Sequence, residues 1–348
     1  MFEPPPFHPA RPSLVAPVRV DASRRCGPTR AQARGTHWRQ SSQGFYVPAH
    51  VTDDDPDQRT VEAAAVTPPG GAVTGWAGLH WQGGVWFDGN LGAGGRRPVT
   101  IATAGRTVRP QPGIAISEEG LGPWEIAEVD GLRVTSVSRS TCFEMRYAPT
   151  DREAVVVLSM AAYSDLTSVE EMASYALAHS GWTGIPRCRW AIGYADENAW
   201  SPAEVRMSLV WQLDAGYARP RCNVPVFDRS GRLIGTPDLI DSEAGVLGEY
   251  DGSLHLAGQQ RAVDLRREEK FRGVGLEPVV MVGSDLHDPS HFVRRLDGAY
   301  RRARREPEST RAWTIEPPPW WTPTLTVAQR RALDPDQRTR WLRHRRAA

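Results

Sequence analysis

The most constraining feature of the chain is the stretch from Ser201 to Leu276, where a helix pattern is followed by short extended runs. Apolar residues recur at helical spacing behind Ser201–Pro202, a pair typical of an N-cap and a first turn. Extended runs follow at 222–228, 233–240 and 246–251, with turn residues between them. The stretch therefore predicts a mixed α/β domain in which a sheet is flanked by helices.

Four carboxylates of this stretch are predicted to converge. Glu204 falls in the first turn of the helix. Side chains alternate along a strand, so Glu249 and Asp251 point the same way. Asp238, on the preceding strand of the same hairpin, is placed to face them. Carboxylates brought this close repel one another unless a cation neutralises them or one of them takes up a proton.

A magnesium ion fits such a cluster. Mg²⁺ keeps several of its waters and is bound by one or two carboxylates together with a substrate phosphate. Water activated by a metal can attack a phosphodiester, so the pattern favours metal-dependent hydrolysis of nucleic acid. The alternative is a set of scattered surface acids, which is the interpretation for the turn residues Asp228, Asp241 and Glu243.

The order of these residues resembles the very-short-patch-repair-like (Vsr-like) branch of the PD-(D/E)xK nucleases, in particular endonuclease domains common in actinobacteria. The matching residues, in chain order, are Glu204, Pro237–Asp238, Glu249-Tyr250-Asp251-Gly252, His255, Gln260-Arg261, Asp264 and Arg267. The sequence departs from most of the superfamily at Asp251, which stands where a catalytic lysine is usual. The one lysine of the chain, Lys270, lies on the following helix pattern and is not expected to replace it.

The resemblance implies a restriction-endonuclease-like fold, a Mg²⁺ or Mn²⁺ cofactor and DNA as the partner. Asp238 and Glu249 would bind the metal, with Glu204 acting through water, and Asp251 or His255 would orient the attacking water. DNA contacts are expected from Gln260, Arg261, Arg266 and Arg267. The alternatives are a structural role for His255 and a solvated helix face for the arginines.

The N-terminal half resembles the AbiEi-type antitoxin family. The similarity lies in the pattern T-x-x-Q-A followed by G-x-Y-V-P, from Thr29 to Pro48, and in Leu132 to Thr141, which match the signature G-x-x-V-T-S-x-x-R-T. A short helix is expected at 29–33, and Thr135 and Ser136 are expected to cap a helix.

The expected organisation has five parts. They are a flexible arm (1–25), an abbreviated winged-helix-like region (26–57), an antitoxin-like middle domain (58–196), the nuclease-like domain (197–305) and a basic tail rich in Arg and Trp (306–348). Interleaved Arg and Trp in the tail suit DNA contacts, and a solvated, partly disordered tail is the alternative.

Composition sets limits on these interpretations. The net charge of +1 gives no global argument for nucleic acid, so any basic surface must be local. The four cysteines are far apart and contain no CxxC pair, which indicates neither zinc nor a disulfide framework and favours a reducing cytoplasm. The apolar stretch from Val155 to Tyr163 is too short to span a bilayer, and no membrane association is expected.

The sequence thus predicts a metal-dependent DNA endonuclease acting in repair or in phage or toxin–antitoxin defence, whose toxin or repair partner it does not identify. The competing interpretation is a DNA-binding regulator of the type IV antitoxin kind with a vestigial nuclease fold, because a fold does not guarantee an activity. A third is a structural interaction protein that binds neither DNA nor metal.

Overall fold

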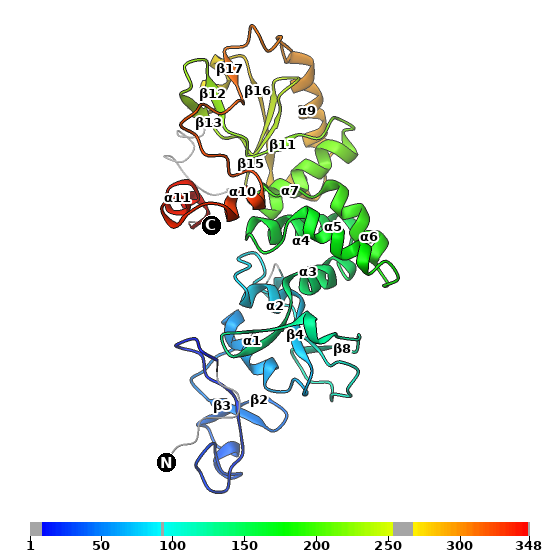
Figure 1. Cartoon of the computed structure of the whole chain (residues 1–348), viewed down its shortest axis with the longest axis vertical. Coiled ribbons are helices and arrows are strands. Elements are labelled where there is room, and N and C mark those ends of the chain that lie inside the picture. The colour runs from blue at the N-terminus through cyan, green and yellow to red at the C-terminus, as the bar shows by residue number, and fades with distance from the viewer. Residues whose placement is uncertain (1–8, 92–93, 253–266, 347–348) are drawn as a thin grey trace. The chain divides into compact units, whose positions relative to one another are not determined.

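A computed structural model describes residues 9–91, 94–252 and 267–346 (Figure 1). The chain divides into two compact units, one of Met1–Ala148 with Ser174–Ile185 and the other of Pro149–Ala173 with Pro186–Ala348. Both units combine helices with strands, so the expected mixed α/β class is confirmed. The second unit includes α4 (Asp151–Tyr163) and therefore begins before the expected boundary at 197.

The first unit contains a five-stranded sheet with the order β8-β7-β4-β10-β9. Its strands are β4 (Ala72–Thr74), β7 (Val99–Ala102), β8 (Ile114–Ser117), β9 (Ile126–Val129) and β10 (Leu132–Thr135). The helices that contact it are α1 (Pro56–Ala64), α2 (Gly75–Trp81) and α3 (Val137–Arg146). Ser136 caps α3 by accepting a hydrogen bond from the backbone N–H of Arg139, as predicted. Thr135 is not a cap, because its hydroxyl contacts the Ser140 hydroxyl at 2.6 Å.

The region expected to be winged-helix-like is a small antiparallel sheet. Its strands β2 (Trp38–Ser42) and β3 (Phe45–Pro48) are joined by β1 (Val18–Arg19) from the segment expected to be a flexible arm, in the order β1-β3-β2. Residues 26–55 are all described and contain no α-helix. The helix expected at 29–33 is a single 3-10 turn, η1 (Gln32–Arg34), in which no residue is buried. A turn with no buried face has no packing to stabilise a longer helix.

Short elements complete the first unit. They are β5 (Asn90–Leu91), β6 (Gly95–Arg96) and the 3-10 turn η2 (Pro123–Glu125). Helix α5 (Val169–Ala178) contributes residues to both units, and α6 (Ile185–Tyr194) belongs to the second from Pro186 onward.

The second unit is organised around a four-stranded sheet with the order β11-β14-β15-β16. The strands are β11 (Arg221–Cys222), β14 (Leu239–Asp241), β15 (Val246–Asp251) and β16 (Glu277–Val282). β14 and β15 form the predicted antiparallel hairpin, and β16 runs parallel to β15. A smaller sheet joins β12 (Val226–Asp228) to β13 (Leu233–Gly235) and β17 (Trp313–Thr314).

One face of the four-stranded sheet is covered by helices. These are α7 (Pro202–Leu209), the π-helical turn η3 (Val210–Asp214) and α9 (Ser290–Arg302). Gly248 lies under α7 and η3, since a Cβ there would come within 3.0 Å of the Trp211 ring. The Trp211 indole donates to the hydroxyl of Tyr300 on α9 at 3.0 Å. The side chains of α7 and η3 thus pack directly against β15 at Gly248, where the strand has no side chain.

The opposite face carries a hydrophobic core. Its buried residues are Val224, Val226, Ile240, Leu247, Phe271, Leu276 and Trp313. Phe271 comes from a helix whose described part covers 267–273. Because Ile240 and Leu247 face this core, alternation places positions 238 and 249 on the same side of the sheet.

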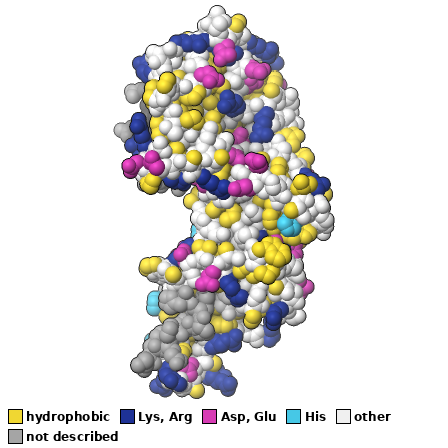
Figure 2. Space-filling model, in the orientation of Figure 1, with side chains coloured by type: hydrophobic (Ala, Val, Ile, Leu, Met, Phe, Trp, Pro, Cys, Tyr) yellow, Lys and Arg dark blue, Asp and Glu magenta, His cyan; other side chains and the backbone are white. Residues whose placement is uncertain are grey.

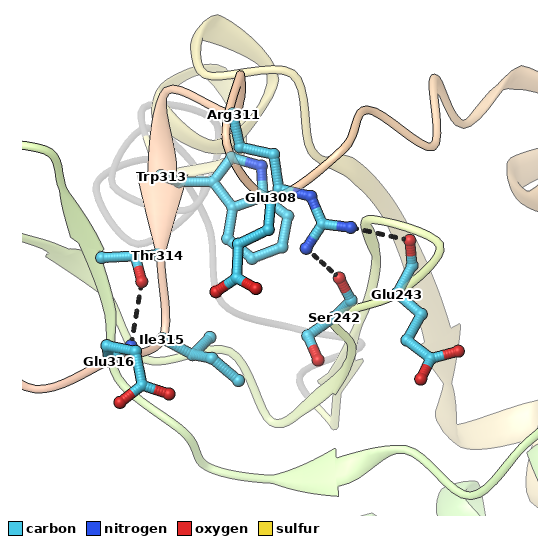
Figure 3. A pocket seen from close by; sticks show the side chains of 8 residues that line it. All are labelled: Ser242, Glu243, Glu308, Arg311, Trp313, Thr314, Ile315 and Glu316. Carbon is cyan, nitrogen blue, oxygen red and sulfur yellow. Dashed lines mark hydrogen bonds between the residues drawn. The ribbon is translucent and has the colours of Figure 1, made fainter.

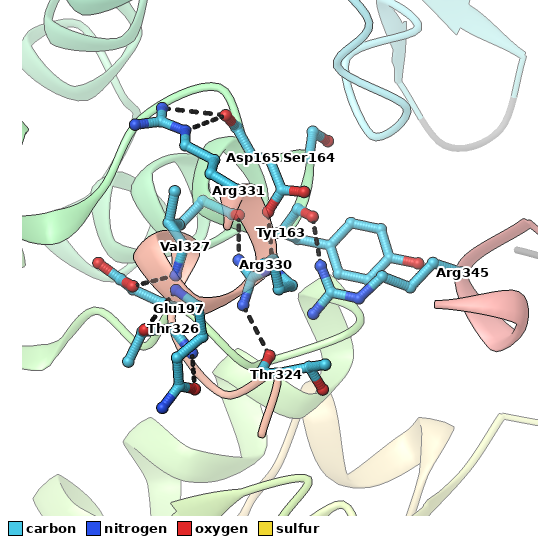
Figure 4. A network of polar contacts seen from close by, with 12 residues as sticks. Tyr163, Ser164, Asp165, Glu197, Thr324, Thr326, Val327, Arg330, Arg331 and Arg345 are labelled. Carbon is cyan, nitrogen blue, oxygen red and sulfur yellow. Dashed lines mark hydrogen bonds and ion pairs between the residues drawn. The ribbon is translucent and has the colours of Figure 1, made fainter. Parts of the chain in front are cut away.

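The C-terminal segment of the second unit is folded against α4. It contains α10 (Val327–Arg331), α11 (Pro335–Trp341) and η5 (Arg343–Arg346), whereas the 3-10 turn η4 (Gly283–Leu286) lies between β16 and α9. Figure 4 shows Arg330, which has no exposed side-chain surface, donating to Asp165 beyond the end of α4 at 2.6 Å. The described part of the expected basic tail therefore has a defined position, and the interpretation as a partly disordered tail does not hold for it.

Charge is distributed evenly over the visible surface. Figure 2 shows basic and acidic side chains interspersed on the face in view. No helix among the residues that the structure describes is long and apolar enough to cross a lipid bilayer.

Candidate functional site

Asp238 and Glu249 lie across from each other at one end of the β14–β15 hairpin. Leu239 pairs with Gly248 in this hairpin, so the register carried one residue further sets Asp238 opposite Glu249. The backbone N–H of Tyr250 donates to Asp238 Oδ2 at 2.7 Å. This hydrogen bond holds the Asp238 carboxylate beside the strand that carries Glu249.

Glu204 reaches the same end of the sheet from the first turn of α7. Ser201 caps the helix, and Glu204 Oε1 accepts a hydrogen bond from the Ser201 hydroxyl at 3.0 Å. The backbone N–H of Trp200 donates to Glu204 Oε2 at 2.7 Å. A salt bridge of 2.9 Å from Arg206 to Glu153 ties α7 to α4. These contacts fix a buried carboxylate that also serves as a capping group.

The charge of Asp238 affects the pKa of Glu204, so the two carboxyls lie near each other. Burial and, after it, the nearby charge of Asp238 raise the pKa of Glu204 to about 7, while the hydrogen bonds from Trp200, Asn223 and Ser201 oppose the increase. Burial also raises the pKa of Asp238, while the Tyr250 N–H and the charge of Arg267 oppose the increase. Two acids with raised pKa values form a site in which added positive charge is favourable.

Arg267 supplies positive charge beside Glu249. Its Nη1 lies 3.2 Å from Glu249 Oε2, and its Nη2 donates to the backbone carbonyl of Thr236. The side chain was expected to contact DNA, and here 37% of it remains exposed to solvent. Arg267 therefore lies among the carboxylates with part of its surface open to a ligand.

The remaining expected site residues are less well placed or lie outside the described ranges. Asp251 is exposed at the end of β15, on the face of the strand that also carries Glu249. The other expected residues, His255, Gln260, Arg261 and Arg266, fall within 253–266 and lie outside the described residues. Within the described ranges, no three His, Cys, Asp or Glu side chains come close enough together to hold a metal ion.

Two buried asparagines support the carboxylates and were not predicted from the sequence. Asn223 Nδ2 donates to Glu204 Oε2 at 2.6 Å and to the Asn198 carbonyl at 2.9 Å. Asn198 Nδ2 donates in return to the Asn223 carbonyl at 3.0 Å. Asn223 has φ 48°, a left-handed conformation that asparagine adopts more readily than most residues. The only sequence signal for this role was the position of Asn223 shortly before β12, and such a position is a weak indication of a buried polar contact.

The C-terminal segment extends this polar network. Arg345 Nη2 donates to Asn198 Oδ1 at 3.4 Å, and its guanidinium lies 4.5 Å from the centre of the Tyr163 ring. Burial, with the neighbouring charge of Arg330, lowers the pKa of Arg345 to about 10. Residues near the C-terminus are therefore part of the surroundings of Glu204, which the sequence did not indicate.

A pocket of about 270 Å³ lies elsewhere in the second unit (Figure 3). It is lined by the turn after β14 and by residues around β17, and Arg311 spans it by donating to the carbonyls of Ser242 and Glu243. Asp241 ends β14 on this side, whereas Asp238 precedes the strand at its other end. The pocket is therefore separate from the carboxylate site.

Comparison of the chain with family models, with curated proteins and with solved structures finds no match.

Proposed function

We propose that the second unit is a Mg²⁺- or Mn²⁺-dependent DNA endonuclease of the Vsr-like, restriction-endonuclease-like type. The observation that supports this proposal best is the approach of Glu204 and Asp238, two acids 34 positions apart whose pKa values are both raised. The pairing of Leu239 with Gly248, continued by one residue, sets Glu249 opposite Asp238. Glu204 lies in the first turn of α7, Asp238 just before β14 and Glu249 in β15, and this arrangement supports the proposal.

The chemistry of these groups fits a hard divalent cation. Buried carboxylates whose pKa values are raised are stabilised when a metal ion neutralises their charge. Mg²⁺ needs one or two protein carboxylates when a phosphate supplies further oxygens, so the lack of three clustered acids among the described residues is compatible with such a site. Asp238 and Glu249 would hold the ion, with Glu204 acting through water.

The bound metal would polarise the phosphate and increase the acidity of a water molecule. The protein groups position the reactants. The Tyr250 N–H fixes the Asp238 carboxylate, and the Ser201 cap fixes Glu204. Arg267 offers a partly exposed guanidinium for a DNA phosphate beside Glu249. Asp251, exposed at the strand end, is suited to orient the attacking water.

The direct test is cleavage of supercoiled plasmid with Mg²⁺ and with EDTA. We expect Asp238→Asn and Glu249→Gln to reduce the rate at least about a hundredfold, because each removes a charge that neutralises the metal. Asp228→Asn is the matched control, since Asp228 ends β12 in the smaller sheet and accepts hydrogen bonds from Ser230 and Arg232. Equal residual cleavage by the wild type and Asp238→Asn would show that the activity does not arise from this site.

The competing proposal is a DNA-binding regulator. The observation in its favour is the ion pair of Arg267 with Glu249, which neutralises one carboxylate without a metal. Binding of DNA that is sequence-specific, unaffected by EDTA and retained in Asp238→Asn, in a protein without cleavage activity, would favour this function over the endonuclease.

A further inference from the structure

Asn223 lies between the two acids whose charges interact. It follows β11 directly, and its backbone N–H donates to the carbonyl of Asp238 at 2.9 Å. Its side-chain Nδ2 donates to Glu204 Oε2 at 2.6 Å. Only 2% of the residue is exposed. One buried side chain is therefore bonded to one candidate ligand while its backbone is bonded to the other.

The amide oxygen of Asn223 is buried and has no hydrogen-bond partner among the residues that the structure describes. The orientation of the amide is set by the two acceptors of Nδ2, which are Glu204 Oε2 and the Asn198 carbonyl. Oδ1 and Nδ2 share one carbon, so the unpaired oxygen belongs to the amide group that contacts the Glu204 carboxylate. Buried polar atoms are nearly always satisfied, and a water or an ion is an ordinary partner for one that no protein group satisfies.

We propose that Asn223 Oδ1 is a ligand of the divalent cation, on the Glu204 side of Asp238. The inference rests on the proposed metal-dependent function and names a residue beyond the expected carboxylates. Amide oxygens are ordinary ligands of hard divalent cations. A neutral ligand adds an oxygen without adding to the negative charge that already raises the pKa of Glu204.

The test is Mn²⁺ binding to the full chain without DNA, measured from the electron paramagnetic resonance signal of free Mn²⁺. Asn223→Ala should weaken binding at least about tenfold, the loss usual for groups that complete a metal site. Asn198→Ala is the matched control, because Asn198 is also buried and makes the reciprocal bond to the Asn223 carbonyl. Each variant loses one of the two reciprocal hydrogen bonds between Asn198 and Asn223, so the melting temperatures of the two variants in EDTA should fall by similar amounts.

Asn223→Asp separates a ligand from a purely structural residue. An aspartate keeps an oxygen at the site but cannot donate to Glu204 or to the Asn198 carbonyl. As a ligand it should bind Mn²⁺ at least as tightly as the wild type, with a lower melting temperature in EDTA that Mn²⁺ restores. As a structural residue it should lose both stability and binding. This variant decides the question should Asn223→Ala fail to fold.

Three outcomes would overturn the inference. Binding by Asn223→Ala within twofold of the wild type would do so, and so would loss of binding in Asn223→Asp. In either case weakened binding by Asp238→Asn would leave the proposed function standing. If the wild type itself bound no Mn²⁺, the proposed function and the role of Asn223 would fail together.

Discussion

Arg267 Nη1 lies 3.2 Å from Glu249 Oε2, so the candidate site already contains one cationic group. The charge of Arg267 also opposes the increase in the pKa of Asp238. A divalent ion and this guanidinium would interact with the same carboxylates. Because the two cations repel each other, each makes the binding of the other less favourable. Arg267 is therefore expected to weaken metal binding while it strengthens the binding of a phosphate.

Replacing Arg267 with methionine should change these two affinities in opposite directions. Mn²⁺ affinity should rise about two- to fivefold, the range expected from a partly exposed ion pair of 0.5–1 kcal/mol. Affinity for duplex DNA in EDTA should fall, and its dependence on salt should become less steep as one phosphate contact is lost. Titration calorimetry with Mn²⁺ and fluorescence anisotropy with labelled DNA measure the two effects.

Arg272→Met is the control for this pair of measurements. Arg272 lies on the same helix and pairs with Glu268 at 2.7 Å, with about half of its side chain exposed. Its removal should leave Mn²⁺ affinity unchanged. A fall in Mn²⁺ affinity in Arg267→Met would contradict the idea that the arginine competes with the metal.

Glu204 predicts how the stability of the metal-free protein depends on pH. Its pKa is about 7 in the folded protein and about 4.5 when unfolded, so the folded state holds the proton more tightly. Between these values the folded state binds more protons than the unfolded state, and stability falls as pH rises. The full loss approaches about 3 kcal/mol, reached above pH 7.

Urea unfolding in EDTA at pH 5 and at pH 8 tests this prediction. The difference in unfolding free energy between wild type and Glu204→Gln isolates the contribution of this carboxyl, because the other titrating groups are shared. The glutamine variant should lose less stability over this interval, and Mg²⁺ should stabilise the wild type more at pH 8 than at pH 5. Identical pH profiles for the two proteins would show that Glu204 ionises normally.

Local patterns predicted much of the second unit. Ser201–Pro202 gave the start of α7, and the runs around Asp238 and Glu249 gave the antiparallel hairpin, because caps and strand alternation depend on residues close in sequence. The contact of Arg267 with Glu249 and the position of Asn223 were not predictable. They depend on how a helix and a two-residue strand pack against the sheet, for which no periodic signal exists.

The C-terminal arginines show the same limit in another way. Composition marked them as a basic surface for DNA, since arginine is rarely buried. Arg330 is fully buried because Asp165, 165 positions earlier, accepts its hydrogen bond. Asp165 has φ 57° just after α4, a conformation that no sequence pattern marked. A partner so distant in sequence is found only in the folded chain.

The burial of Arg330 leads to a prediction about stability. Arg330→Met leaves Asp165 without its buried partner and removes further bonds from Arg330 to the carbonyls of Ala162 and Thr324, at 2.7 and 3.1 Å. The expected loss is about 3–5 kcal/mol, the range for breaking a buried ion pair on one side. Arg331→Met is the matched control, because the neighbouring residue pairs with Glu171 at 2.6 Å but is exposed, and it should cost at most about 1 kcal/mol.

The double variant Arg330→Met with Asp165→Asn tests whether the loss arises from the uncompensated charge. Removing both charges should restore part of the stability, since no unpaired carboxylate then remains against α10. Full restoration is not expected, because Arg338 also pairs with Asp165, at 3.0 Å. Urea unfolding of the wild type, of Arg330→Met, of Asp165→Asn and of the double variant gives the coupling free energy between the two residues. Equal losses in Arg330→Met and Arg331→Met would contradict the burial of Arg330, and with it the docking of the C-terminal segment beside the residues that support Glu204.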